Sequence, residues 1–303
     1  MKQRTIRNSF KVEGIGLHTG LPLTLTLNPA SENHGIQIRR TDLTNAPLIE
    51  AIADNVCNTL RGTVLCKGEI RVSTIEHALA ALYAYNIDNC LIEVNGPEFP
   101  ILDGSAKLYV EQLNMVGITE QSLPAEYVEI TEEIEYVSDT GSVIRAFPSE
   151  LLELEVEIGF NSDVLSQQTA TLTNIRLFQE EIAAARTFVF VHEIEPLLNM
   201  NLIKGGDLKN AIVIYDRLMS QEAVDHLSEK LQQPRIDASI PGYLSGDLNY
   251  ENEPARHKLL DLLGDLALTG KRLKGRIVAF HPGHKANTEF AKILRQTYIL
   301  TEQ

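Results

Sequence analysis

The sequence predicts an α+β fold built from two units of similar organisation. Segments in which apolar and polar residues alternate predict strands, and segments with apolar residues every three or four positions predict helices. Both kinds of segment occur in the same order in each half of the chain, with antiparallel hairpins favoured over a doubly wound sheet. The 303 residues, 44% hydrophobic and 22% charged, suffice for one large or two medium globular domains.

The first half opens with strands and continues with a helix, a strand and a second helix. In LPLTLTLNP (21–29) the leucines share one face of an alternating segment within residues 1–30. A helix is predicted from Ser73, in STIEHALAALYAYN, and a strand follows in NCLIEVNGP. The second helix, DGSAKLYVEQLNMVG, should end near Gly117, because glycine is common just after a helix.

The second half repeats this order. PARHKLLDLLGDLALTG predicts a helix, RIVAFHP a strand and GHKANTEFAKILRQ another helix. His77 lies 27 residues before Gly104, and His257 lies 26 before Gly283. The matched spacing suggests an internal duplication of a sheet-and-helix unit.

A change in composition marks the expected domain junction. QSLPAEYVEI (121–130) contains a proline and small polar residues, and alternating β-branched residues follow it up to about residue 160. We therefore expect a first domain over residues 1–122 and a second over residues 126–303, which also opens with strands.

Charge and composition exclude several classes of protein. A formal net charge of −14 without a basic stripe argues against a nucleic-acid partner. The N-terminal segment MKQRTIRNSFKVEG lacks the apolar core of a signal peptide, and no apolar run is long enough for a transmembrane helix. The three cysteines are not in C-x-x-C spacing, which excludes a cysteine zinc cluster and fits a reducing compartment. We expect a cytoplasmic protein. The sequence leaves the oligomeric state open, and a monomer is our expectation.

One pair of polar residues in the second half has the spacing of metal ligands. His257 and Asp261 are four residues apart, so both lie on one face of the predicted helix. With His77 they would form the N,N,O set of catalytic zinc sites, which leaves a position for water. Iron(II) would also suit such a set. The alternatives are a solvated His–Asp pair and a surface histidine at His77.

Two further residues could supply acid–base chemistry. Glu76, next to His77, could take a proton from a metal-bound water, and His284 at the start of a helix could protonate the leaving amine. The alternative for Glu76 is a capping box with Ser73. The alternative for His284 is an ordinary loop histidine.

Motifs along nearly the whole chain resemble the UDP-3-O-acyl-N-acetylglucosamine deacetylases, the zinc enzymes of the committed step of lipid A biosynthesis. The segments that carry the resemblance are GIGLHTG, RRTDL, STIEHALAAL, IDNCLIEVNGPEFPILDGSA, ARTFVF, LIKGGDLKNAIV, RHKLLDLLGDLALTG and GHKANT.

The resemblance implies two similar domains, each a β-sheet packed against α-helices, with the active site between them. It implies zinc at His77, His257 and Asp261, and Glu76 as the general base. His284 would be the protonated group, positioned by Asp265. Thr187 would polarise the amide oxygen.

The resemblance also implies how a UDP-linked, acylated amino sugar binds. Lys258 would face the diphosphate, and Phe160 would stack on uracil; a buried aromatic at a strand end is the alternative for Phe160. An inserted unit near residues 188–212 would line a passage for the acyl chain, or would simply pack. Its candidate residues are Phe188, Leu197, Leu198, Met200 and Leu202.

The chain departs from the family pattern at a few positions. Ser162-Asp163 replaces a His-Pro pair, Val143 stands where a lysine is common, and Val189 adds bulk beside the acyl passage. These departures concern nucleotide affinity and acyl length. They keep two alternatives open: a zinc amidase for a different acylated sugar, and a non-catalytic paralogue that binds a sugar nucleotide.

Overall fold

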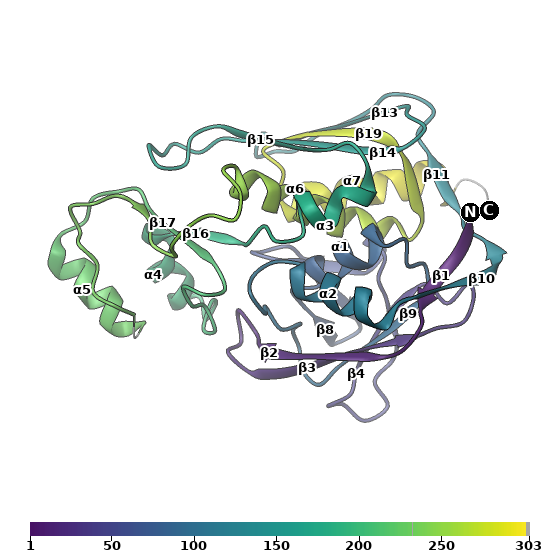
Figure 1. Ribbon diagram of the computed structural model, residues 1–303, viewed down its shortest axis with the longest axis horizontal. Coiled ribbons are helices and arrows are strands. Elements are labelled where there is room, and N and C mark those ends of the chain that lie inside the picture. The colour runs from purple at the N-terminus through teal and green to yellow at the C-terminus, as the bar shows by residue number, and fades with distance from the viewer. Residues whose placement is uncertain (232, 301–303) are drawn as a thin grey trace.

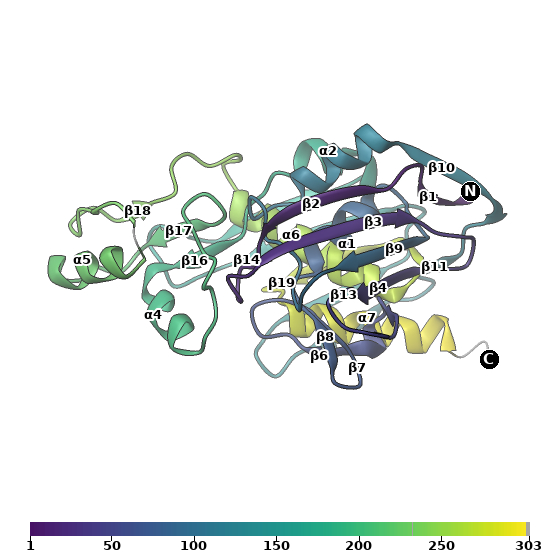
Figure 2. The same ribbon diagram turned by 90° about the horizontal axis from the view of Figure 1, so that it is seen from below.

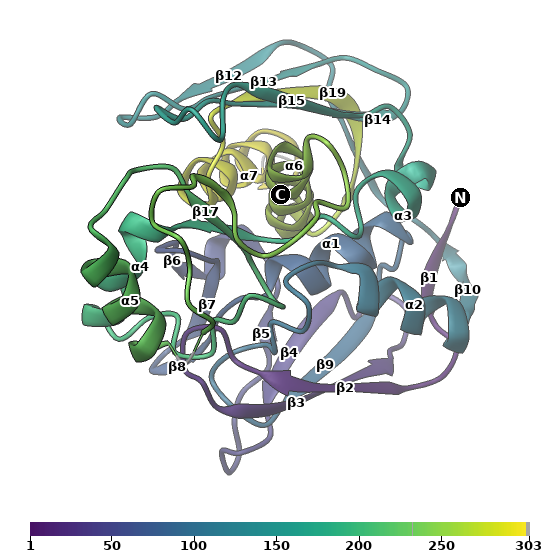
Figure 3. The same ribbon diagram turned by 60° about the vertical axis from the view of Figure 1, so that its left-hand side comes forward.

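Two β-sheets enclose a layer of helices in the computed structural model, which describes residues 1–231 and 233–300. In Figure 1 one sheet lies above the helices and the other below them, and Figure 3 shows the same three layers from another side. Within the described ranges, no helix is both long enough and apolar enough to span a bilayer.

The first sheet comes from the first half of the chain. Its strands lie in the order β2, β3, β9, β4, β5, and β9 and β4 are parallel while the other neighbours are antiparallel. Alternate residues of β3 are buried, as the leucine pattern predicted. The strands are β2 (Phe10–Ile15), β3 (Pro22–Pro29), β4 (Ile36–Arg40), β5 (Ile49–Glu50) and β9 (Cys90–Val94).

The second sheet has the same topology. Its order is β12, β13, β19, β14, β15, and β19 and β14 are the parallel neighbours. β11 adds a sixth strand, parallel to β19. The strands are β11 (Tyr127–Glu129), β12 (Ile134–Val137), β13 (Val143–Phe147), β14 (Leu152–Ile158), β15 (Gln168–Leu172) and β19 (Arg272–Phe280).

Equivalent helices flank the equivalent strands. α1 (Glu76–Ala84) precedes β9 and α2 (Lys107–Val116) follows it, as α6 (Glu253–Leu266) precedes β19 and α7 (His284–Tyr298) follows it. α1 packs against α6 in the middle layer. Nearly every residue of both helices is therefore buried, including polar ones that a single apolar stripe would leave in water.

A smaller unit projects from the three layers, at the left of Figures 1 and 2. It contains a three-stranded sheet in the order β16, β17, β18 and has separate apolar clusters. Its elements are β16 (Phe188–Phe190), α4 (Val191–Asn199), β17 (Ile212–Tyr215), α5 (Gln221–Lys230) and β18 (Gly242–Tyr243). The unit thus continues well beyond residue 212.

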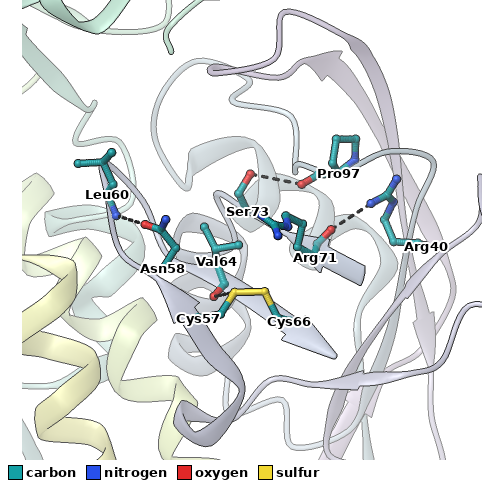
Figure 4. Close-up of a disulfide and its surroundings, with 9 residues drawn as sticks. All are labelled: Arg40, Cys57, Asn58, Leu60, Val64, Cys66, Arg71, Ser73 and Pro97. Atoms are coloured by element: carbon teal, nitrogen blue, oxygen red, sulfur yellow. Dashed lines mark hydrogen bonds between the residues drawn. A yellow bond between two sulfur atoms is a disulfide. The ribbon is translucent and has the colours of Figure 1, made fainter. Parts of the chain in front are cut away.

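A small sheet leads into α1. Its strands are β6 (Val56–Asn58), β7 (Val64–Lys67) and β8 (Ile70–Val72). A disulfide joins Cys57 of β6 to Cys66 of β7 across this antiparallel pair (Figure 4). No disulfide was expected from the spacing of the three cysteines, which fitted a reducing compartment, and Cys90 is a buried free thiol.

The remaining elements are short. They are β1 (Lys2–Ile6), which pairs with β10 (Ile118–Pro124), the 3-10 helices η1 (Ala53–Asn55), η2 (Ile175–Leu177) and η3 (Ala267–Thr269), and α3 (Phe178–Glu181).

The architecture confirms the predicted α+β fold with two similar sheet-and-helix units. Gly117 ends α2 with a φ of 74°, as expected of a glycine cap. The predicted junction at residues 120–126 overlaps the end of β10, and the exact domain limits remain a prediction.

Candidate active site

Three helices bring the predicted polar residues to one cavity. Glu76 and His77 begin α1, His257 and Asp261 lie on α6, and His284 begins α7. The cavity is open to solvent, contains about 900 Å³ of empty space, and is lined by these five residues together with Thr187, Lys258 and others. Residues from both halves of the chain therefore share one site.

His77, His257 and Asp261 form a buried cluster. Their candidate ligand atoms all lie within 4.8 Å of one another. Asp261 Oδ1 is 3.4 Å from His257 Nε2 and 3.7 Å from His77 Nε2. The two imidazole rings are nearly perpendicular, with centroids 5.1 Å apart, so they meet edge to face and do not stack.

The cluster suits a divalent metal ion. Asp261 Oδ1 is buried without a hydrogen-bond partner, although buried polar atoms are rarely left unpaired. His257 Nδ1 lies 3.0 Å from the carbonyl oxygen of Ala185. Because a carbonyl only accepts, Nδ1 carries the proton and Nε2 keeps a lone pair for a ligand. Two nitrogens and one carboxylate oxygen match a catalytic zinc set.

The electrostatics favour neutral histidines and an ionised aspartate. Burial, and then the neighbouring His257, lower the pKa of His77 to about 3. Burial also lowers the pKa of His257. Burial alone would raise the pKa of Asp261, but His257 and Lys258 outweigh it and hold that pKa below its usual range. These are the protonation states in which the three side chains bind a metal.

Glu76 lies beside the cluster and is 3% exposed. Burial raises the pKa of its carboxyl to about 7, although the nearby His284 opposes the shift. The capping-box reading is wrong: α1 begins after Ile75, and Glu76 Oε2 accepts from the backbone N–H of Thr63 at 3.1 Å. A carboxyl group with this pKa is well matched to proton transfer near neutral pH.

His284 lies across the cavity as part of a hydrogen-bonded pair. Its Nδ1 is 2.9 Å from Asp265 Oδ2, and its Nε2 is 3.9 Å from Asp261 Oδ2. Burial alone would lower its pKa, but Asp265 and Asp261 raise the pKa to about 9. The raised pKa favours the imidazolium at neutral pH. His284 begins α7 and pairs with Asp265, so it is not the ordinary loop histidine of the alternative interpretation.

Thr63 is a site residue that the sequence analysis missed. Its hydroxyl donates to Asp265 Oδ1 at 2.5 Å and lies 3.4 Å from His284 Nδ1. It precedes β7, 202 residues away from Asp265. The neighbouring sequence, Arg61-Gly62-Thr63, did not mark Thr63 as a site residue. Its contact with Asp265 forms only when the two halves of the chain come together.

Thr187 lies where two cavities meet. It lines the polar cavity and also an apolar cavity of about 1050 Å³ in the projecting unit. Phe188, Val189 and Leu197 line the apolar cavity, whereas Leu198, Leu202 and Met200 are not among its described lining residues. Leu198 instead packs against the apolar cluster of that unit, and Met200 is 52% exposed.

Phe160 lies at the mouth of a third cavity. It is 38% exposed, so it is not the buried strand-end aromatic of the alternative reading. Its ring meets those of Phe188 and Phe190 at centroid distances of 5.6 and 5.2 Å. Ser162 and Lys258 line the same cavity, and Lys258 Nζ also lies 2.8 Å from Asp261 Oδ2.

Comparison with known proteins gives a consistent result. The family model described as "LpxC: UDP-3-O-acyl N-acetylglycosamine deacetylase" matches residues 3–232 and 236–296. The chain is 54% identical, over 100% of its length and 66% of the relative's, to the bifunctional enzyme LpxC/FabZ of Bacteroides thetaiotaomicron. It is 52% identical to the protein of that name from Porphyromonas gingivalis, over 97% of the chain and 64% of the relative.

A shorter relative is covered more fully. The UDP-3-O-acyl-N-acetylglucosamine deacetylase of Helicobacter hepaticus is 39% identical over 95% of the chain and 88% of its own length. The chain spans only about two thirds of the length of the bifunctional relatives.

Proposed function

This chain belongs to the LpxC family of UDP-3-O-acyl-N-acetylglycosamine deacetylases, and we propose that it hydrolyses the acetamido group of UDP-3-O-acyl-N-acetylglucosamine. The products are acetate and the free amine, and the reaction is the committed step of lipid A biosynthesis. A cytoplasmic location goes with this proposal, because the substrate is a nucleotide-activated sugar.

One observation carries the proposal. The clustered ligand atoms of His77, His257 and Asp261, with Asp261 Oδ1 unpartnered, lie in one cavity. The same cavity holds Glu76 and His284, whose pKa values are both raised. The cofactor of the proposal is Zn²⁺, with Fe²⁺ as the other ion that the donor set accepts. A divalent ion held there lowers the pKa of a bound water and polarises a carbonyl oxygen.

The chain's own residues perform the proton transfers. Glu76 accepts a proton from the attacking water as the bond from water oxygen to the acetyl carbon forms. His284 donates its Nε2 proton to the sugar nitrogen as the carbon–nitrogen bond breaks, so a neutral amine leaves. Asp265 accepts from His284 Nδ1 and keeps the imidazolium oriented. The hydroxyl of Thr187 donates to the amide oxygen, where negative charge develops.

In this proposal the other two cavities bind the acyl chain and the nucleotide of the substrate. The apolar cavity beyond Phe188 takes the fatty acyl chain, because most of the residues that line it are apolar. Phe160 offers a ring face to uracil, and Lys258, together with Arg61 and Arg217, supplies positive charge near the diphosphate. These three cations outnumber the two acidic residues that line the same cavity, Glu193 and Asp216, in a chain whose formal net charge is −14.

The test is acetate release from UDP-3-O-acyl-N-acetylglucosamine by the zinc-loaded protein. Glu76→Ala serves as the variant, since it removes the base and leaves the three ligands. We expect turnover by the wild type and a loss of about 10²- to 10⁴-fold in the variant, the usual contribution of a general base. A folded, zinc-bound wild type that released no acetate would sink the proposal.

A second candidate concerns the substrate only. Ser162, which replaces a family histidine, lines the cavity beside Phe160. A zinc amidase for a different acylated sugar would turn over a non-UDP acylated sugar faster than the UDP-linked one. Side-by-side kinetics with both substrates separate these candidates.

A further inference from the structure

We infer that Thr63 is a positioning residue that locks the Asp265–His284 pair and the Glu76 carboxylate into one geometry. This inference rests on the proposed function, because it assigns Thr63 a part in the same reaction. Thr63 is fully buried and lies in the segment between β6 and β7, outside the three helices that carry the other site residues.

Thr63 contacts both sides of the proton-transfer machinery. Its backbone N–H donates to Glu76 Oε2 at 3.1 Å, and its hydroxyl donates to Asp265 Oδ1 at 2.5 Å. An ionised carboxylate only accepts, so the single hydroxyl proton points to Asp265. The 3.4 Å approach to His284 Nδ1 is then a secondary contact.

The hydroxyl completes the set of donors around Asp265. Oδ2 of Asp265 accepts from His284 Nδ1 and from Asn287 Nδ2, each at 2.9 Å. Thr63 is the donor recorded on the other oxygen, Oδ1. Without that donor the carboxylate can rotate about its χ2 bond, which has a broad torsional minimum. A rotation of Asp265 would turn the imidazolium away from the leaving nitrogen.

The segment that carries Thr63 is anchored on both sides. The Cys57–Cys66 disulfide closes the strands at its base, and Asn58 Oδ1 accepts from the N–H of Leu60 (Figure 4). At its tip, the guanidinium of Arg61 pairs with Glu193 of α4 at 2.6 Å. A threonine held by such a segment can orient its neighbours, since it has little freedom of its own.

The chemistry of this role separates Thr63 from the reacting groups. Thr63 gives up no proton in the reaction. Its hydrogen-bonding contacts are with Glu76, Asp265 and His284, and none of these is a proposed metal ligand. Its loss should therefore lower kcat while substrate binding and metal content stay near normal.

The experiment compares Thr63→Val, Thr63→Ser, Asp265→Asn and the Thr63→Val/Asp265→Asn double variant in the acetate-release assay. Valine keeps the shape and the backbone N–H but lacks the hydroxyl. Thr269→Val is the matched control. Thr269 is also fully buried, and its hydroxyl donates to the backbone carbonyl of Lys271, outside the site. Zinc content and thermal unfolding are measured for each protein.

We expect Thr63→Val to lower kcat about 10- to 100-fold, the factor for a lost hydrogen bond to a charged group, with KM nearly unchanged. Thr63→Ser should recover most of the activity, and Thr269→Val should retain it. In the double variant kcat should be close to that of Asp265→Asn alone, because Thr63 acts through Asp265. Unchanged kcat in Thr63→Val, or fully additive losses, would overturn the inference.

A crystal structure of the Thr63→Val protein decides the question without turnover. Asp265 should have rotated away from its 2.9 Å contact with His284 Nδ1. An unmoved Asp265–His284 pair would overturn the positioning role. If the wild type itself released no acetate, the proposed reaction would fail, and this structural comparison would still test Thr63.

Discussion

Gly264 of α6 lies directly against the backbone carbonyl of Glu76 at the start of α1. A Cβ at position 264 would collide with that carbonyl oxygen. The missing side chain lets the two helices approach closely enough for the ligands of both halves to meet. Gly264 thus determines the separation between His77 on α1 and the ligand pair on α6.

Gly264→Ala should push α1 and α6 apart. We expect a loss of about 1–3 kcal/mol of stability, the usual cost of overpacking a buried contact, and weaker metal binding. Calorimetry and zinc titration measure the two effects. Glu111→Ala, on the exposed face of α2, is the control and should change neither. Wild-type stability and zinc affinity in the Gly264→Ala protein would show that the close approach is unnecessary.

His257→Ala should abolish stoichiometric metal binding. The variant loses one of three ligands, the histidine whose Nε2 lies 3.4 Å from Asp261 Oδ1. We expect affinity to fall by more than about 100-fold, beyond the effect of changing an outer-shell partner. Elemental analysis after dialysis measures the zinc content. His226→Ala is the control, because His226 is exposed on α5. Full zinc content in His257→Ala would remove His257 from the ligand set.

The pH dependence of kcat/KM should be bell-shaped. Glu76 must be ionised to act as a base, so activity should fall as the pH drops below its pKa of about 7. His284 must be protonated to act as an acid, so activity should fall as the pH rises above its pKa of about 9. The measurement is kcat/KM across both limbs with metal content checked at each pH.

Asp265→Asn should move both limbs of that profile to lower pH. The negative charge of Asp265 raises the pKa of His284 and, to a smaller degree, that of Glu76. Its removal therefore lowers both values. A profile with one limb, or an alkaline limb that Asp265→Asn leaves in place, would contradict the acid role of His284.

Val189→Phe should shorten the preferred acyl chain. Val189 lines the apolar cavity, and a phenyl ring there displaces the end of a long chain. Each buried methylene is worth about 0.8 kcal/mol, so displacing two should lower kcat/KM for long-chain substrates about ten-fold or more relative to short-chain ones. Val137→Phe, on an exposed face of β12, is the control. An unchanged chain-length preference would place the acyl group elsewhere.

Much of the fold could be predicted because its elements have strong local patterns. The alternating leucines of β3, the glycine after α2 and the proline in the first turn of α6 each correspond to an observed strand or helix boundary. The matched order of elements in the two halves also anticipated the shared sheet topology.

The features that local patterns did not predict depend on contacts between distant segments of the chain. Taken alone, Ser73 to Glu76 also fitted a capping box, the alternative to the predicted base, but the carboxylate of Glu76 accepts from the N–H of Thr63 instead. A surface histidine was the alternative to the predicted ligand at His77, because a helix with one apolar stripe exposes its other face; in the structure nearly all of α1 is buried. The disulfide was missed because Cys57 and Cys66, nine residues apart, approach only in the irregular register of β6 and β7.

The repeated topology brings two similar units to one site that is not symmetric. Two copies of one unit, meeting face to face, would present the same helix twice, and a symmetric contact would offer identical groups from both sides. Here α1 supplies Glu76 and His77 while α6 supplies His257 and Asp261, so the copies have specialised. Because the two units lie in one chain, a substitution in either unit changes the site from one side only, whereas in a symmetric pair of identical chains it would change both sides at once.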